Sequence, residues 1–245
     1  MDFDFLFGPV EDLDGALTQL FDGASIGVAL LVALILGLRH ASDPDHLVAV
    51  TSLVAADGGG SRAAARLGAW WGIGHAVTLL VVGMPLILLR SSFPSWFEAG
   101  AETAVGLVIV LLAGRVTLKW LKGDYRAGPH SYGSRRHRHL RRGSGGHSHV
   151  AVRSPRQAAA LGVLHGLAGS GAVVLLLIAA LPTQLAAAAA LAVFAPMSAL
   201  SMAACSGAFA WLLTRPVVEP LYRTVLIPAF GAFGLTFGLW YAGLT

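Results

Sequence analysis

The sequence is poor in charged residues and nearly lacks cysteine. Only 12% of its 245 residues are charged, whereas a soluble domain carries about 25%. The single cysteine, Cys205, excludes an intrachain disulfide and a CxxC metal site. No Gly-x4-Gly-Lys-Ser/Thr phosphate-binding pattern occurs, so any use of ATP would need a partner protein. Residues 1–23 contain several acidic residues but no Lys or Arg, so we expect no signal peptide.

Long apolar segments are abundant instead. Hydrophobic residues make up 56% of the chain, and the mean hydropathy is +0.70. Apolar runs of about twenty residues recur, which is the length a helix needs to cross a bilayer core. The runs are continuous, whereas the strands of a membrane β-barrel alternate. We therefore predict an all-α polytopic membrane protein with about six transmembrane helices, at residues 25–56, 67–89, 100–120, 157–181, 185–213 and 222–242.

Basic residues are concentrated in alternate loops. They follow the first span, fill residues 115–156 and precede the sixth span. Cytoplasmic loops carry such an excess, so we expect a multi-pass protein of the cytoplasmic (inner) membrane with both termini extracytoplasmic. The net charge of +4 therefore marks topology, and nucleic acid is not an expected partner. Aromatic residues at the predicted span ends are typical of an interfacial belt: Trp70, Trp71, Trp96, Trp120, Trp211, Trp240 and Tyr241.

A polar cluster interrupts the first apolar segment, in the stretch Arg39-His40-Ala-Ser-Asp43-Pro44-Asp45-His46. A charge near the bilayer centre costs about 2.5–3.5 kcal/mol on insertion scales, so such residues are functional candidates. The alternative is a polar loop between two short helices. Pro44 lacks a backbone donor and should kink or break the helix, and Pro196 should bend the fifth span.

The cluster has the chemistry of a metal site. On a continuous helix, His40, Asp43 and His46 fall within a 120° arc, and Asp45 falls on another face. Imidazole nitrogen suits Ni, Co, Zn, Cu and Fe(II), and carboxylates neutralise charge or orient the histidines. Arg39 is expected to pair with an aspartate. Supporting or structural roles are assigned to Arg39, Ser42, Pro44, Thr78 and Ser170.

Two histidines in other spans are further candidate ligands. His75 and His165 lie among small residues that permit close approach of helices, and the alternative is that each is a helix-packing residue. Met197, Met202 and Cys205 offer soft sulfur, although apolar packing is the favoured interpretation there. In the polar loop, His130, His137, His139, His147 and His149 either bind a metal weakly or belong to a solvated basic loop.

A short pattern occurs twice, as Leu36-Gly-Leu-Arg-His40 and as Leu161-Gly-Val-Leu-His165. Each copy opens a set of three predicted spans. Because three is odd, the second set would enter the membrane in the opposite direction, as in the inverted repeats of secondary transporters. We expect an acidic extracytoplasmic segment at 1–23, a first three-helix half at 24–121, a His/Arg-rich cytoplasmic loop at 122–155 and a second half at 156–245.

These motifs resemble those of the nickel/cobalt transporter (NiCoT) superfamily. The stretch from His40 to His46 fits its H-x4-D-H signature, and Gly72-Ile-Gly-His-Ala-Val-Thr78 resembles its second motif. The resemblance implies that His40, Asp43, Asp45 and His46 select and bind Ni²⁺ or Co²⁺, with His75 assisting. Longer members have eight spans and an Asp/Thr/Glu-rich later motif. The six expected spans and His165-Gly-Leu-Ala-Gly-Ser170 are closer to the shorter, urease-accessory-type branch.

We therefore predict a secondary transporter of Ni²⁺ or Co²⁺ and not an enzyme. The metal is its substrate, no cofactor is expected, and membrane lipid and a second copy of the chain are candidate partners. An intramembrane zinc hydrolase is one alternative, because three histidines and a carboxylate can hold a catalytic Zn²⁺. No His-Glu-x-x-His motif supports it. An exporter of a small organic or sulfur-containing anion is another, disfavoured because Asp43 and Asp45 would repel the anion.

Overall fold

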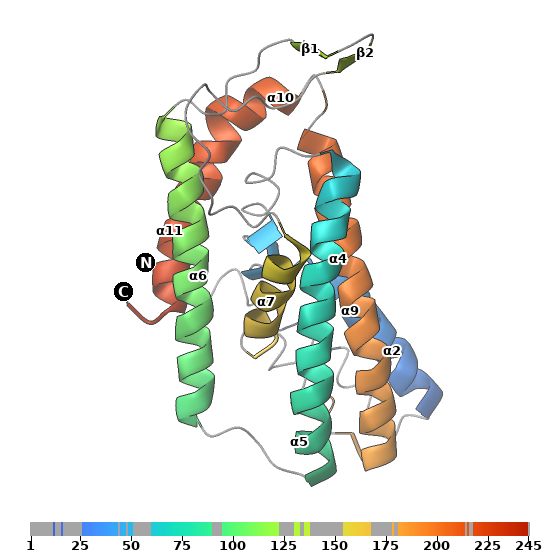
Figure 1. Cartoon of the computed structure of the whole chain (residues 1–245). Coiled ribbons are helices and arrows are strands. Elements are labelled where there is room, and N and C mark those ends of the chain that lie inside the picture. The colour runs from blue at the N-terminus through green and yellow to red at the C-terminus, as the bar shows by residue number, and fades with distance from the viewer. Residues whose placement is uncertain are drawn as a thin grey trace.

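The protein is an assembly of long apolar helices (Figure 1). The computed structural model describes residues 12, 16, 26–43, 45–47, 49–50, 60–89, 95–122, 130–132, 135–137, 154–167, 178, 181–213, 215 and 218–244.

Four stretches of helix are long and apolar enough to cross a membrane. They run over Ser61–Leu89, Ala99–Leu121, Gln184–Leu213 and Thr224–Tyr241. The first comprises α4 (Ser61–Thr78), a π-helical turn η1 (Leu79–Gly83) and α5 (Met84–Leu89). The second lies in α6 (Ser95–Leu121), the third is α9 (Gln184–Leu213), and the fourth combines most of η2 (Tyr222–Leu226) with α11 (Ile227–Tyr241). These helices confirm a helical membrane protein and agree with four of the predicted spans.

The first and fourth predicted spans are described only in part. The first contains α2 (Ile26–His40), an apolar helix of 15 residues, and the fourth contains α7 (Pro155–His165), of 11 residues. Residues 51–56 of the first span and most of the fourth span after His165 lie outside the described residues. Six spans therefore stay a prediction.

Small residues allow the helices around the predicted site to pack closely. α4 packs against both α7 and α9, α2 packs against α9, and α6 packs against α11 (Figure 1). A Cβ added at Gly162 of α7 would overlap the backbone oxygen of Trp71 on α4, and one added at Gly37 of α2 would lie 2.8 Å from the backbone oxygen of Phe194 on α9. Glycine at these positions lets backbones approach where a side chain would separate them.

A capping box starts α7. Ser154 accepts a hydrogen bond from the backbone N–H of Gln157, and the Gln157 side chain accepts one from the backbone N–H of Ser154. Pro155 follows at the first helical position, where its missing N–H costs nothing. These local signals fix the start of the helix that ends at His165.

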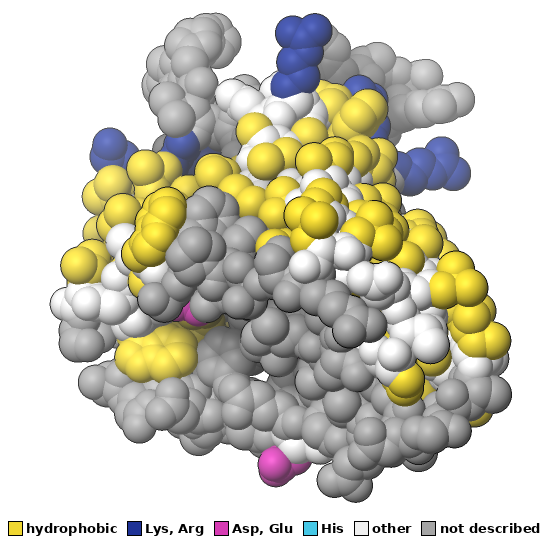
Figure 2. Space-filling model, turned by 90° about the horizontal axis from the view of Figure 1, so that it is seen from below, with side chains coloured by type: hydrophobic (Ala, Val, Ile, Leu, Met, Phe, Trp, Pro, Cys, Tyr) yellow, Lys and Arg dark blue, Asp and Glu magenta, His cyan; other side chains and the backbone are white. Residues whose placement is uncertain are grey.

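The described surface is largely apolar, as a bilayer requires. In Figure 2, hydrophobic side chains dominate the described part of the visible face, and Lys and Arg side chains gather toward one edge of the view. Trp96 and Trp211 are exposed, as expected of an interfacial belt. The expectation is wrong for Trp71, which is only 1% exposed.

Part of the predicted cytoplasmic loop forms a small hairpin. Strands β1 (His130–Tyr132) and β2 (Arg135–His137) pair antiparallel, with His130 opposite His137. His139, His147 and His149 lie outside the described residues, so weak metal binding by this loop stays a prediction.

Candidate metal centre

The first helix breaks next to the polar cluster. α2 ends at His40, where the backbone N–H of Ser42 donates to Arg39 O at 2.7 Å and that of Asp43 donates to His40 O at 3.1 Å. A helical hydrogen bond resumes from Leu47 N–H to Asp43 O at 2.9 Å. The predicted break near Pro44 is therefore confirmed, although Pro44 itself lies outside the described residues.

The break brings both aspartates into one cluster. On a continuous helix Asp45 would have faced away from His40, Asp43 and His46. The helix is not continuous: the turn at residues 41–43 redirects the chain, and Asp45 is fully buried against His46 and His165.

Histidines from three segments meet at this point. His40 Nε2 lies 3.0 Å from Nε2 of His75, which is on α4. The rings of His40 and His46 are 4.3 Å apart, and those of His46 and His165 are 4.4 Å apart. His40, His46 and His75 are 0% exposed, and His165 is 5% exposed. One nitrogen from each of His40, His46 and His75 lies within 4.8 Å of the others, so these three can hold a metal ion.

The two carboxylates hold different parts of the cluster. Asp43 accepts a 2.8 Å hydrogen bond from Nη1 of Arg39, and its other oxygen lies 3.1 Å from Nδ1 of His40. Asp45 bridges two histidines, with Oδ1 at 3.1 Å from Nδ1 of His46 and Oδ2 at 3.2 Å from Nε2 of His165. A second possible ligand group therefore consists of Asp45, His46 and His165.

The cluster is negatively charged when its imidazoles are neutral. Asp43 and Asp45 are both 0% exposed and carry two negative charges, which the partly buried Arg39 offsets by one. Arg39 pairs with Asp43, whereas Asp45 contacts His46 and His165. A buried charge of this kind is costly without a counter-ion, and a divalent cation would supply one.

Two aromatic rings enclose the cluster and had no signal in the sequence. The Trp71 ring lies 5.4 Å from the His46 ring and 5.6 Å from the His165 ring. The Phe194 ring lies 5.1 Å from the ring of His40. Both side chains are buried, and they shield the imidazoles from lipid and water.

The residues that were expected to support the site differ in their burial and in their contacts. Thr78 is buried and donates to the backbone oxygens of Gly74 and Val163, so it ties α4 to α7. Ser201 of α9 donates to the backbone oxygen of Leu38 and fixes the end of α2. Ser42 is exposed, and Ser170 lies outside the described residues. Met202 and Cys205 pack in an apolar cluster with Trp71, as the packing interpretation predicted.

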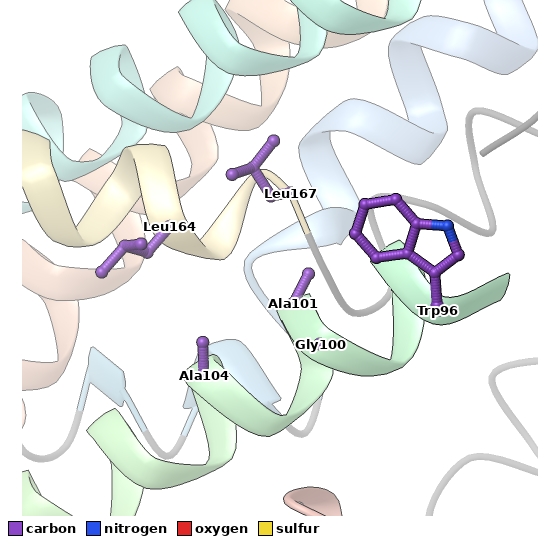
Figure 3. Close-up of a pocket in the computed structure, with 6 residues that line it drawn as sticks. All are labelled: Trp96, Gly100, Ala101, Ala104, Leu164 and Leu167. Atoms are coloured by element: carbon purple, nitrogen blue, oxygen red, sulfur yellow. The ribbon is translucent and has the colours of Figure 1, made fainter. Parts of the chain in front are cut away.

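A cavity of about 210 Å³ between α6 and α7 is separate from this centre (Figure 3). Its lining consists of Trp96, Gly100, Ala101, Ala104, Leu164 and Leu167. None of these side chains is a metal ligand, so the cavity does not offer an ion site.

The chain is similar to the urease accessory protein UreH of Bacillus sp. (strain TB-90). The two sequences are 34% identical over 149 residues, which is 60% of this chain and 60% of the relative. The matched part thus spans less than two thirds of the relative's length. No family model and no solved structure matches the chain. The similarity to UreH confirms the resemblance to urease-accessory-type proteins that the sequence motifs indicated.

Proposed function

We propose that this chain is a secondary transporter of the nickel/cobalt superfamily, and that it moves Ni²⁺ or Co²⁺ across the cytoplasmic membrane. The observation that carries the proposal is the buried cluster of His40, Asp43, Asp45, His46, His75 and His165 within a bundle of membrane-length helices. Ionisable residues buried at membrane depth mark ion pathways because hydrocarbon excludes them elsewhere.

The types of ligand suit a late first-row divalent ion. Imidazole nitrogens together with carboxylates bind Ni²⁺ and Co²⁺ as well as Zn²⁺, so the donor set supports a transition metal and leaves its identity to the transport assay. Similarity to a protein named as an accessory factor weighs against the zinc hydrolase alternative.

The charge of the cluster supports a cation as substrate. Two buried carboxylates and one arginine give the cluster a net charge of minus one when its imidazoles are neutral, and this charge attracts a divalent ion and repels the anions of the exporter alternative. An inside-negative potential would favour uptake of a divalent ion by about 4.6 kcal/mol per 100 mV.

We further infer that two inverted three-helix halves, residues 24–121 and 156–245, rock about this centre. The helices of the first half are α2, α4 and α6, and their counterparts in the second half are α7, α9 and α11. If each helix is exchanged for its counterpart, the same pairs of helices pack together. α2 packs on α9 as α7 packs on α4, and α6 packs on α11. Both α2 and α7 end at a histidine of the centre. Inverted halves around a midplane site are the architecture of alternating access in secondary transporters.

The matching extends to single residues. Gly37 of α2 faces the backbone oxygen of Phe194, and Gly162 of α7 faces that of Trp71. The Phe194 ring packs on His40, and the Trp71 ring packs on His165. Each half therefore supplies one aromatic ring that covers the histidine of the other half. This reciprocal packing of aromatic rings on histidines supports the inverted repeat more strongly than the short Leu-Gly-x-x-His pattern alone.

Metal uptake and efflux in cells that express the chain test the proposal. Accumulation and loss of radioactive nickel and cobalt are measured against zinc, iron and manganese, with both termini tagged to establish that they are extracytoplasmic. The variant His75→Ala should abolish nickel flux at normal protein levels. The matched control Val77→Ala, at a position 49% exposed on the same helix, should not. Equal flux in both variants would refute the site.

A further inference from the structure

We propose that the metal centre holds one ion in either of two overlapping positions that share His46. The first position lies between His40, His46 and His75, and the second lies between Asp45, His46 and His165. In each group the ligand atoms lie within 4.8 Å of one another. This inference rests on the proposed transport function and concerns how the ion passes through the centre.

The two ring nitrogens of His46 have different hydrogen-bonding surroundings. Nδ1 lies 3.1 Å from Oδ1 of Asp45, whereas Nε2 is buried and has no hydrogen-bond partner among the described residues. A ligating nitrogen must be unprotonated, and a carboxylate on the other ring nitrogen fixes the tautomer that leaves it so. In the first position His46 therefore binds the ion through Nε2, while Asp45 accepts the hydrogen bond from Nδ1–H.

The second position uses the same residues in another way. Asp45 now holds Nδ1 of His46 and Nε2 of His165 with its two oxygens. An ionised carboxylate only accepts hydrogen bonds, so both nitrogens carry protons in this arrangement. For an ion to bind there, each neutral imidazole adopts its other tautomer, with the proton on Nε2 of His46 and on Nδ1 of His165, and Asp45 then becomes a ligand.

The two positions therefore exclude each other. His46 binds the ion through Nε2 and keeps its proton on Nδ1 in the first position, whereas it binds through Nδ1 in the second. A neutral imidazole has only one unprotonated nitrogen at a time. Two divalent ions in such close groups would also repel each other strongly. One ion is bound at a time.

A transfer between the positions would move the ion toward the second half of the protein. Every ligand of the first position comes from residues 40–75, whereas the second position keeps Asp45 and His46 and adds His165 of α7. The His165 side chain is 6% exposed, and the side chains of Asp45 and His46 are 0% exposed. The second position therefore contains the most exposed of these ligands, His165.

The test compares binding with flux in the full-length protein. Purified protein in detergent is titrated with Ni²⁺ by equilibrium dialysis and with Co²⁺ by visible absorption, and nickel flux is measured in liposomes. The variants are His75→Ala, His165→Ala and their combination, each checked for a single folded species by gel filtration. Val77→Ala and Leu164→Ala are matched controls at exposed positions of the same two helices. His165→Gln replaces His165→Ala if the latter does not fold.

Wild-type protein should bind one nickel ion. His165→Ala should keep the wild-type nickel affinity and cobalt spectrum but lose flux about 10-fold or more, because only the second position is removed. His75→Ala should still bind one ion, about 10–100-fold more weakly and with a changed cobalt spectrum. The combined variant should not bind.

Three results would overturn the two positions and leave the proposed function standing: two nickel ions per chain, equal losses of affinity in both single variants, or wild-type flux in His165→Ala. Wild-type protein that neither binds nor transports nickel or cobalt would instead overturn the proposed function, and this inference with it.

Discussion

Replacing Gly162 by alanine should separate α7 from α4 and remove His165 from the metal centre. A Cβ at this position would lie 1.9 Å from the backbone oxygen of Trp71 and 2.8 Å from the backbone nitrogen of His75. Ordinary contact begins at 3.4 Å, so the helices would have to part locally by about 1.5 Å. The obstacle is backbone on both sides, and no side-chain rotation can relieve it.

The shift is large compared with what a metal site tolerates. Ligand distances in functional sites hold to within about 0.2 Å, so a displacement of about 1.5 Å removes His165 as a ligand and breaks its contact with Asp45. Overpacking of this kind costs about 1–3 kcal/mol or more. In a helix interior with free space, the same substitution gains about 1 kcal/mol.

Gly114 of α6 provides that comparison. A Cβ there meets only a side-chain carbon of Leu235, at 3.8 Å. We expect Gly114→Ala to unfold at or above the wild-type temperature with unchanged nickel flux, and Gly162→Ala to unfold at a lower temperature and to lose flux. Thermal unfolding in detergent and flux in liposomes measure the two effects. Indistinguishable behaviour of the two variants would refute the close packing of α7 on α4.

Three further substitutions test other contacts. Arg39→Ala should destabilise the protein by about 3 kcal/mol, because it leaves the Asp43 carboxylate buried without its 2.8 Å ion pair; unchanged thermal unfolding would contradict this. Trp71→Ala should cost about 3–5 kcal/mol and weaken nickel binding by loosening the ring of His46, whereas Trp71→Phe should retain binding in equilibrium dialysis. Ser154→Ala removes the cap of α7 and should cost about 1 kcal/mol in thermal unfolding, and a matching loss of nickel affinity would show that the cap does more than start the helix.

The polar residues of the centre could be predicted from the sequence because placing them within a membrane costs free energy. Histidine and aspartate are rare in apolar segments for this reason, so the stretch from His40 to His46 could be identified from the sequence alone. The break beside it was predictable from Pro44, since proline cannot continue a helix undisturbed. The second, third, fifth and sixth spans were predictable from length and hydropathy. The third, fifth and sixth lie within two residues of their expected bounds, and the second begins six residues earlier than expected.

The assembly of the centre was not predictable in detail. His40 meets a partner 35 residues away, and Asp45 meets one 120 residues away, and no local pattern encodes such pairings. The direction of Asp45 depends on the turn at residues 41–43, which a helical wheel ignores. Trp71 was assigned to the membrane interface because it falls near the end of a predicted span, yet of the pair Trp70 and Trp71 only Trp70 is exposed. Adjacent residues on a helix point about 100° apart, so the pair divides between lipid and the site.

Nickel flux into liposomes that contain purified wild-type protein or His46→Ala tests transport through the metal centre, because His46 belongs to both ligand groups. The liposomes carry an inside-negative potential, and the control is Leu47→Ala, at a neighbouring position 45% exposed. Nickel should accumulate in liposomes with wild-type protein or the control, and should not accumulate with His46→Ala. Accumulation by folded His46→Ala at the wild-type rate would contradict transport through this centre.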